Sequence, residues 1–124
     1  EQEPVTLRFT FWGSAAEKNA IEALAASFHE AYPYITVETQ HIPSDYEAKM
    51  SAMVAGNEEP DLGYVRDFMA LEFAESGKLY NVLDLIEADD SLELEDFAED
   101  FFLILGRGQG VRPLYRRRIL CAVL

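Results

Sequence analysis

The chain has 124 residues, which is enough for one domain or for part of a larger one, and 49% of them are apolar, so it can bury a core. Its formal net charge of −13 argues against nucleic acid and anionic membrane surfaces as main partners, because both are polyanions. The single cysteine excludes an internal disulfide and a cysteine-based zinc site, and no apolar run is long enough to span a bilayer.

The first predicted elements are a strand and a helix. Residues 5–11 alternate apolar and polar positions, which is the period of a strand with two different faces. Ser14 and Glu17 have the spacing of a capping box, so a helix is expected after Trp12-Gly13, and Pro33 ends it. The apolar residues that share one face of this helix are Ile21, Leu24, Ala25, Phe28 and Tyr32.

A second strand and helix follow. Residues 35–42 alternate again, and this strand is polar enough to be expected near an edge of the sheet. Ser44 and Glu47 predict a second capping box, and Gly56-Asn57 can end the helix with a left-handed residue. The residues expected on one face of this helix are Tyr46, Met50, Met53 and Val54.

The third strand is predicted over residues 62–65. Asp67 is expected to cap a helix over residues 68–76, which Gly77 closes, and further short helices are expected over residues 79–88 and 92–102. Strands separated by single helices imply right-handed crossovers. The predicted fold class is therefore α/β, with a mainly parallel sheet and helices on both faces.

Ligands of open parallel sheets bind beyond the carboxyl ends of the strands, which selects the three stretches that follow the predicted strands. The candidate ligand-binding residues there are Trp12, Gly13, Ser14, Tyr46, Arg66 and Asp67. An aromatic ring can cover the apolar face of a sugar while carboxylate and guanidinium groups hydrogen-bond to its hydroxyls. Structural roles stay open: Trp12 and Tyr46 as core, Ser14 and Asp67 as caps, and Arg66 as a surface partner of Asp67.

Signatures of catalysis are absent from the sequence. The tail glycines follow no predicted strand and precede no lysine, so they do not make a phosphate-binding loop. His29 and His41 do not have the spacing of metal ligands, and no serine sits in a nucleophile elbow. The sequence therefore predicts neither an enzyme nor a metal or cofactor site.

Four stretches in order resemble the N-terminal lobe of bacterial extracellular solute-binding proteins of family 1, which serve ABC sugar importers. They are LRFTFWG, AIEALAASFHEAYPYITVETQHIP, DYEAKMSAMVAGNEEPDLGYV and FAESGKLYNVLDLI, and the likeness covers roughly residues 5–100. The residues that match the family pattern are Phe28, Pro33, Ile35, Val37, Tyr46, Lys49, Ala55, Gly56, Pro60, Asp61, Gly77, Leu79 and Leu83.

This resemblance implies a periplasmic-binding-protein-like (type II) first lobe of a two-lobed receptor that closes on its ligand. It implies a carbohydrate ligand, often an oligosaccharide, an ABC permease as membrane partner, a monomer, and export to the periplasm or the outer face of the cell membrane. The beginning EQEPVTL suits a mature exported protein or a trimmed chain. Arg66 and Asp67 match the family's ligand loop, but Val65 replaces a frequent aromatic there, which leaves the sugar's identity open.

The end of the chain differs from the rest in charge. Residues 1–106 carry a formal charge of −18, whereas residues 107–124 hold five arginines and no acid. Codons compatible with residues 109–124, read one nucleotide later, permit the Lys-Val-Tyr-Gly-Leu that the family has at this point. We therefore hypothesise a change of reading frame between about residues 101 and 108, with a native basic tail as the alternative.

The expected organisation is thus a truncated lobe over residues 1–104 and a non-native-looking tail over residues 105–124. The expected function is an incomplete substrate-binding component of a sugar importer, with half a cleft and very weak affinity. One alternative is a freestanding acidic α/β interaction module without a transport role. Another is a flavodoxin-like enzyme domain, which residues 12–14 disfavour because they lack phosphate-loop glycines.

Overall fold

The computed structural model describes residues 2–79 and 88–91. It divides the chain into two compact units, Glu1–Tyr64 and Val65–Leu124, which are described separately below. The helices predicted over residues 79–88 and 92–102 fall almost entirely outside the described residues, and the basic tail does so completely. The hypothesis of a changed reading frame therefore stays a prediction.

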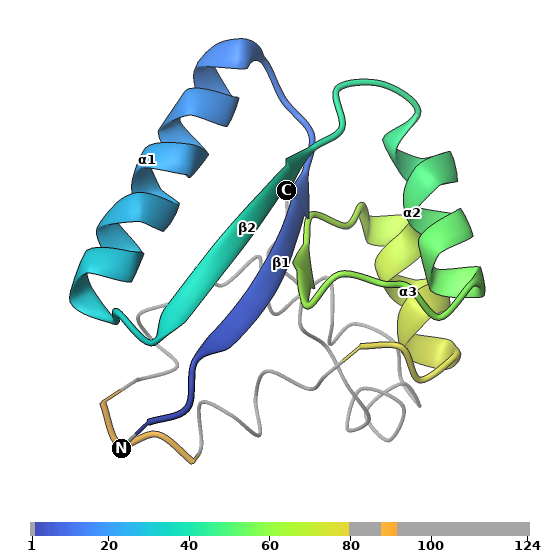
Figure 1. Cartoon of the computed structure of the whole chain (residues 1–124). Coiled ribbons are helices and arrows are strands. Elements are labelled where there is room, and N and C mark those ends of the chain that lie inside the picture. Colours follow the sequence, from blue (N-terminus) through green and yellow to red (C-terminus); the bar gives the residue numbers. More distant parts are fainter. Residues whose placement is uncertain (1, 80–87, 92–124) are drawn as a thin grey trace. The chain divides into compact units, whose positions relative to one another are not determined.

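A parallel sheet forms the centre of the first unit (Figure 1). Its described strands are β1 (Val5–Phe11), β2 (Ile35–His41) and β3 (Leu62–Gly63), in the order β2-β1-β3. Phe11 pairs with His41 on one side of β1, and Thr10 pairs with Gly63 on the other. The predicted parallel sheet is confirmed, and β2 lies at an edge of the described sheet, as its polar sequence predicted.

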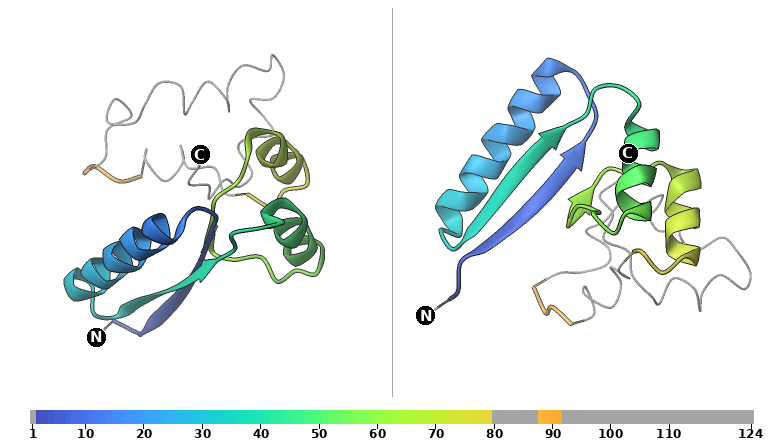
Figure 2. Two further views of the ribbon diagram at one scale, coloured as in Figure 1. Left: turned by 90° about the horizontal axis from the view of Figure 1, so that it is seen from above. Right: turned by 45° about the vertical axis from the view of Figure 1, so that its right-hand side comes forward.

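The helices α1 (Ala15–Ala31) and α2 (Tyr46–Ala55) connect these strands (Figure 1, Figure 2). The crossover through α1 leads from β1 outward to β2, whereas the crossover through α2 leads back past β1 to β3. Two right-handed crossovers that run in opposite directions place their helices on opposite faces of the sheet. The predicted α/β arrangement with helices on both faces is therefore present in the first unit.

The core of the first unit is concentrated at the carboxyl end of β1. Thr10 and Phe11 are fully buried, so this end of the strand is covered on both faces rather than on alternate positions. Around them, Ile42, Tyr46 and Met50 are also buried. In β2, by contrast, half-buried and exposed residues alternate along the whole strand, as the sequence pattern predicted.

The predicted apolar face of α1 is present but is not buried. No residue of this helix is buried, and the exposed fractions of Leu24, Phe28 and Tyr32 are 69%, 37% and 47%. The rings of Phe28 and Tyr32 pack against each other, with centroids 4.9 Å apart. Helical spacing therefore predicts which residues share a face, but it does not by itself show that the face is covered.

Two capping boxes were predicted, at the amino ends of α1 and α2, and one of them is formed. The capping box of α1 is confirmed, whereas the box predicted at Ser44 and Glu47 is wrong: Asp45 is the N-cap of α2, and its side chain makes no cap hydrogen bond. Asp45 has a left-handed backbone (φ 54°), unlike the extended N-cap that normally directs a side-chain oxygen to the first turn. Asn57, also at φ 54°, supplies the left-handed residue expected after α2.

Within the second unit, α3 (Asp67–Glu75) is the described element. Its N-cap is Arg66 with an extended backbone, so the prediction that Asp67 caps this helix is wrong by one residue. Gly77, at φ 75°, follows the helix in the left-handed conformation that the sequence predicted. Among the described residues of this unit, the buried apolar ones are Val65, Met69, Ala70, Phe73, Ala74 and Leu79.

A side chain extends the pairing between β1 and the segment before β3. The Asp61 carboxylate accepts a hydrogen bond from the backbone amide of Arg8 at 2.8 Å, one position before the register pair Phe9–Leu62. The Arg8 guanidinium donates to the backbone carbonyl of Glu58. These bonds hold the loop that leads into β3 against β1, next to the point where β3 begins.

Candidate functional site

The carboxyl ends of the parallel strands meet at one edge of the sheet. After β1 the chain passes through Trp12, Gly13 and Ser14, after β2 it passes through residues 42–45, and after β3 comes Tyr64. The amide of Ile42 donates to the carbonyl of Phe11 at 2.9 Å, so the first two segments leave the sheet side by side. This carboxyl edge of the first unit is where open parallel sheets bind ligands.

Trp12 lies between two tyrosine rings at this edge. Its ring is edge-to-face with that of Tyr46, with centroids 4.9 Å apart and planes at 81°, and edge-to-face with that of Tyr64 at 4.9 Å and 71°. Each such pair stabilises the arrangement by about 0.5–1.5 kcal/mol beyond the area it buries. Trp12 is half-buried, so its indole is fixed in orientation by the two tyrosines while part of it stays at the surface.

Tyr46 supports this arrangement from the core. Its side chain is 4% exposed, and its hydroxyl lies 2.7 Å from the carbonyl of Tyr64 and 3.0 Å from that of Thr10. A phenol has one hydrogen to donate, so the two carbonyls share it. The structure brings Trp12 and Tyr46 together, and it gives Tyr46 the core position that the sequence left open as an alternative to ligand contact.

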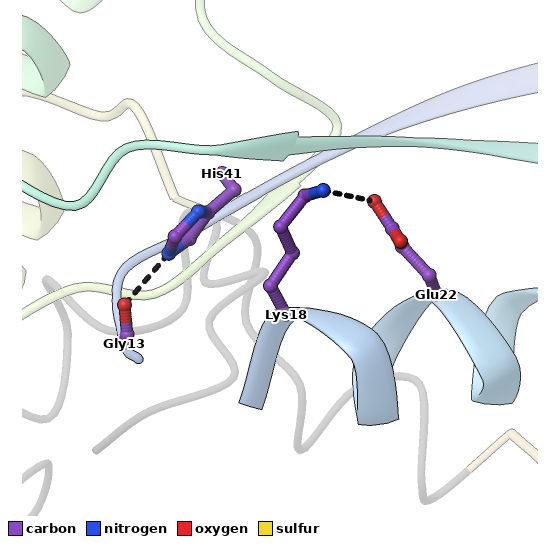
Figure 3. Close-up of polar contacts among 4 residues, drawn as sticks. All are labelled: Gly13, Lys18, Glu22 and His41. Carbon is purple, nitrogen blue, oxygen red and sulfur yellow. Dashed lines mark hydrogen bonds and ion pairs between the residues drawn. The ribbon is translucent and has the colours of Figure 1, made fainter. Parts of the chain in front are cut away.

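Gly13 makes the turn between β1 and α1. Its φ of 132° lies in the region that favours glycine, and a Cβ there would stand 2.8 Å from Oε2 of Glu17. Nε2 of His41 lies 2.7 Å from the Gly13 carbonyl (Figure 3), and since a carbonyl only accepts, the imidazole donates. The ring of His41 also stacks on Phe11 with centroids 5.4 Å apart. His41 of β2 thus contacts both the turn at Gly13 and the last residue of β1, and so holds the turn in place.

Ser14 is exposed and caps α1. Its Oγ accepts from the amide of Glu17 at 3.3 Å, and its own amide donates to Oε2 of Glu17 at 2.6 Å. A serine hydroxyl that accepts one bond still has its hydrogen to donate. Ser14 can thus cap the helix and bond to a ligand oxygen at the same time, so the two readings of this residue are compatible.

The charged groups around the carboxyl edge interact with one another. The bonds from Ser14 hold the pKa of Glu17 below its usual value, and the nearby His41 adds to this effect. Lys18, the residue after Glu17, forms an ion pair at 3.2 Å with Glu22, which lies one turn further along α1 (Figure 3). The Lys49 ammonium donates to the carbonyl of Ser44 at 3.2 Å. Glu17 is therefore a carboxylate at neutral pH.

Arg66 and Asp67 belong to the second unit. Arg66 is exposed and is the N-cap of α3, and Asp67 is the first residue of that helix. Both follow β3 in the chain by only a few residues. The predicted site residues therefore fall into two groups, with Trp12, Gly13, Ser14 and Tyr46 together at the carboxyl edge of the first unit and the other two at the start of α3.

Sequence reasoning did not assign three residues that shape this edge. Tyr64 lay inside the predicted third strand, and its aromatic side chain next to the strand end was the available signal. His41 ends β2, and its bond to Gly13 depends on the pairing of β2 with β1, which a local pattern does not contain. Glu17 was assigned only as half of a capping box, although its carboxylate lies beside Ser14.

Two searches of the described residues bear on other classes of site. Within residues 2–79 and 88–91, no group of three or more His, Cys, Asp or Glu side chains is placed to hold a metal ion. No helix in the same part of the chain combines the length and the apolar character needed to cross a membrane.

Comparison with solved structures identifies the fold. A family 1 extracellular solute-binding protein from Alicyclobacillus acidocaldarius is 27% identical, with a TM-score of 0.71 over 85% of this chain and 26% of its own. A periplasmic solute-binding protein from Pectobacterium atrosepticum is 26% identical, with a TM-score of 0.71 over 86% of this chain and 25% of its own. The chain thus spans about a quarter of the length of these proteins.

More distant structures share the fold. An ABC substrate-binding protein from Listeria monocytogenes, solved with cycloalternan, is 20% identical, with a TM-score of 0.74 over 87% of this chain and 27% of its own. A de novo designed cysteine esterase is 22% identical, with a TM-score of 0.68 over 81% of this chain and 24% of its own. The same fold therefore occurs in a binding protein and in a designed enzyme.

No protein-family model and no curated protein matches the sequence. The structural matches nevertheless agree with the resemblance that the four sequence stretches carry, and they are mainly binding proteins. The described part of this chain has the fold of a partial lobe of the extracellular solute-binding proteins of family 1, as its sequence predicted.

Proposed function

We propose that the carboxyl edge of the first unit is one wall of a carbohydrate-binding site. The observation that carries this proposal is the half-buried indole of Trp12, which Tyr46 and Tyr64 hold edge-on beside the exposed hydroxyl of Ser14. A fixed aromatic plane next to a hydroxyl donor matches the two kinds of surface on a sugar, its apolar C–H face and its hydroxyl groups. Arg66 and Asp67, which belong to the second unit, stay ligand residues predicted from the sequence alone.

The comparisons support this choice of ligand class. Among the similar structures, one is in complex with cycloalternan and another with saturated digalacturonic acid, both of which are carbohydrates. We propose that this chain is the substrate-binding component of an ABC importer of sugars or oligosaccharides, exported to the periplasm or the outer face of the cell membrane. Its membrane partner would be the permease of that importer.

We further propose that this stretch of chain, studied by itself, binds sugar weakly, since it spans about a quarter of the length of the similar binding proteins. Two-lobed receptors enclose the ligand between two walls, and one wall leaves much of the ligand's hydration in place. A dissociation constant of about 1 mM or weaker, equivalent to about 4 kcal/mol of binding free energy, is the expected range. No catalytic step is assigned, since the site is built from groups that hold a ligand in place.

Saturation-transfer difference NMR tests this proposal, because it detects ligands in the millimolar range. We expect saturation transfer from the chain to neutral oligosaccharides such as maltotetraose, and loss of that transfer in Trp12→Ala. Tyr32→Ala is the matched control, since Tyr32 is an exposed aromatic residue whose carbonyl bonds to the first residue of β2, at the opposite edge of the sheet. Equal loss in both variants, or no transfer to any sugar tested, would refute the proposal.

The freestanding interaction module remains the second candidate, and one observation favours it. Leu24, Phe28 and Tyr32 expose apolar surface along one face of α1. Such a face can bind another protein surface. The two candidates differ in what Trp12→Ala does: it abolishes the function of a sugar site, whereas a module that binds through α1 is unaffected.

A further inference from the structure

The amino end of α1 has an unusual charge for a position beside a proposed ligand site. Helix amino ends carry free amides and a partial positive charge, so they attract anions. Here an anion of the chain itself takes that place, since Oε2 of Glu17 lies 2.6 Å from the amide of Ser14. A ligand carboxylate that approaches Ser14 therefore meets the negative charge of Glu17 at the amide of Ser14.

The position of the Glu17 carboxylate is fixed by several contacts. The bond from the Glu17 amide to Oγ of Ser14 closes the capping box, so the two residues hold each other. Gly13 leaves the room for this arrangement, because a Cβ at that position would stand 2.8 Å from Oε2. The lowered pKa of Glu17 keeps the group ionised at neutral pH.

The basic groups of the first unit near this edge already interact with other groups. Lys18 pairs with Glu22 at 3.2 Å, and the ring nitrogen Nε2 of His41 bonds to the Gly13 carbonyl (Figure 3). The Lys49 ammonium bonds to the Ser44 carbonyl. Among the described residues of the first unit, Glu17 is thus the charged group that bonds to the turn itself.

We infer that Glu17 makes the proposed site select neutral oligosaccharides over oligosaccharides that carry carboxylate groups. This inference rests on the proposed function, because it concerns the ligand of the same site. Neutral hydroxyls can accept the remaining hydrogen of Ser14, and the charge of the Glu17 carboxylate does not repel them. A uronate in the same place is repelled by the Glu17 carboxylate, which makes Glu17 a specificity-determining residue.

The test compares a neutral and an acidic sugar on the chain and on Glu17→Gln. Glutamine keeps an oxygen that can accept from the Ser14 amide, so the capping box survives while the charge is removed. Glu30→Gln is the matched control, since it removes the same charge from an exposed position near the other end of α1. Affinities for maltotetraose and for digalacturonate are measured by ligand-observed NMR titration at low ionic strength.

We expect the chain to bind maltotetraose more tightly than digalacturonate. Glu17→Gln should raise the affinity for digalacturonate by roughly three- to fivefold and leave that for maltotetraose nearly unchanged, since removing one like charge at close range in water has about this effect. The gain should shrink at about 0.5 M NaCl, where screening is stronger. Glu30→Gln should leave both affinities as they are.

The possible outcomes separate the inference from the proposed function. If both sugars bind equally well and Glu17→Gln changes neither affinity, the inference is overturned while the sugar site stands. A rise in digalacturonate affinity of the same size in Glu30→Gln would also overturn it, because the effect would then come from net charge alone. If neither sugar binds, the proposed function fails and the inference fails with it.

Discussion

Replacing Tyr46 with phenylalanine removes one hydroxyl from the core and leaves the ring contact with Trp12 in place. The Thr10 carbonyl loses a bond of 3.0 Å but keeps the amide of Tyr64, which donates to it at 2.9 Å. The Tyr64 carbonyl loses the shorter bond, 2.7 Å from the same hydroxyl. This contact is part-buried, and a shielded acceptor left without its donor costs about 1–3 kcal/mol, so we expect a loss of unfolding free energy toward the lower end of this range.

Urea denaturation followed by the fluorescence of Trp12 measures this loss. Trp12 is the single tryptophan of the chain and lies against Tyr46, so the signal reports on this part of the fold. Tyr32→Phe is the matched control, because Tyr32 is 47% exposed and removal of a surface hydroxyl should cost little. A loss below about 0.5 kcal/mol for Tyr46→Phe, or an equal loss for the control, would refute the reasoning.

Three further predictions concern the turn and the loop that shape the edge. Gly13→Ala should lower the unfolding free energy by about 1–3 kcal/mol, because φ is 132° at this position and the new Cβ would clash with Glu17. Thermal denaturation measures this loss, and an unchanged melting temperature would contradict the proposed strain. Glu17 has a lowered pKa, so its contribution to stability is present near neutral pH and is lost in acid, as the pH falls through that lowered pKa. The stability difference between the chain and Glu17→Gln should therefore vanish in acid, and a difference that grows there would contradict this sign. Asp61→Ala removes the acceptor of the Arg8 amide and should cost about 0.5–1.5 kcal/mol; hydrogen exchange at that amide should speed up, and undiminished protection would show that the bond contributes nothing.

Local sequence signals predicted the elements of the fold well. The alternation of residues 5–11 and 35–42 gave β1 and β2 almost to the residue, and the capping box at Ser14 is formed. The left-handed Asn57 and Gly77 follow α2 and α3 as expected. The caps depend on residues close in the chain, and the alternation of each strand can be recognised within that strand alone, which is why local sequence sufficed for these features.

The errors occur where the backbone departs from the usual geometry. Asp45 has the residue type of an N-cap, but its left-handed conformation prevents the usual cap bond, so the second capping box does not form. The third strand is shorter than predicted, since β3 ends at Gly63. Tyr64, which was predicted to lie in that strand, instead contacts Trp12 and Tyr46, and no local sequence pattern predicts these contacts.

The candidate site was predicted in its location but not in its internal roles. The rule that ligands bind beyond parallel strands selected Trp12, Gly13, Ser14 and Tyr46, and the structure brings these four to one edge. Tyr46 proved to be buried, and His41 holds the turn through a bond across the two strands. Such roles depend on contacts between residues far apart in the sequence.

Chemical-shift mapping of sugar binding tests the central claim most directly. Amide resonances of the chain are followed while maltotetraose is added at millimolar concentration. We predict that the largest shifts fall on residues 12–14 and on Tyr64, at the carboxyl edge of the sheet. Shifts confined to the amino ends of the strands, around Val5 and Ile35, or the absence of any shift, would contradict the account.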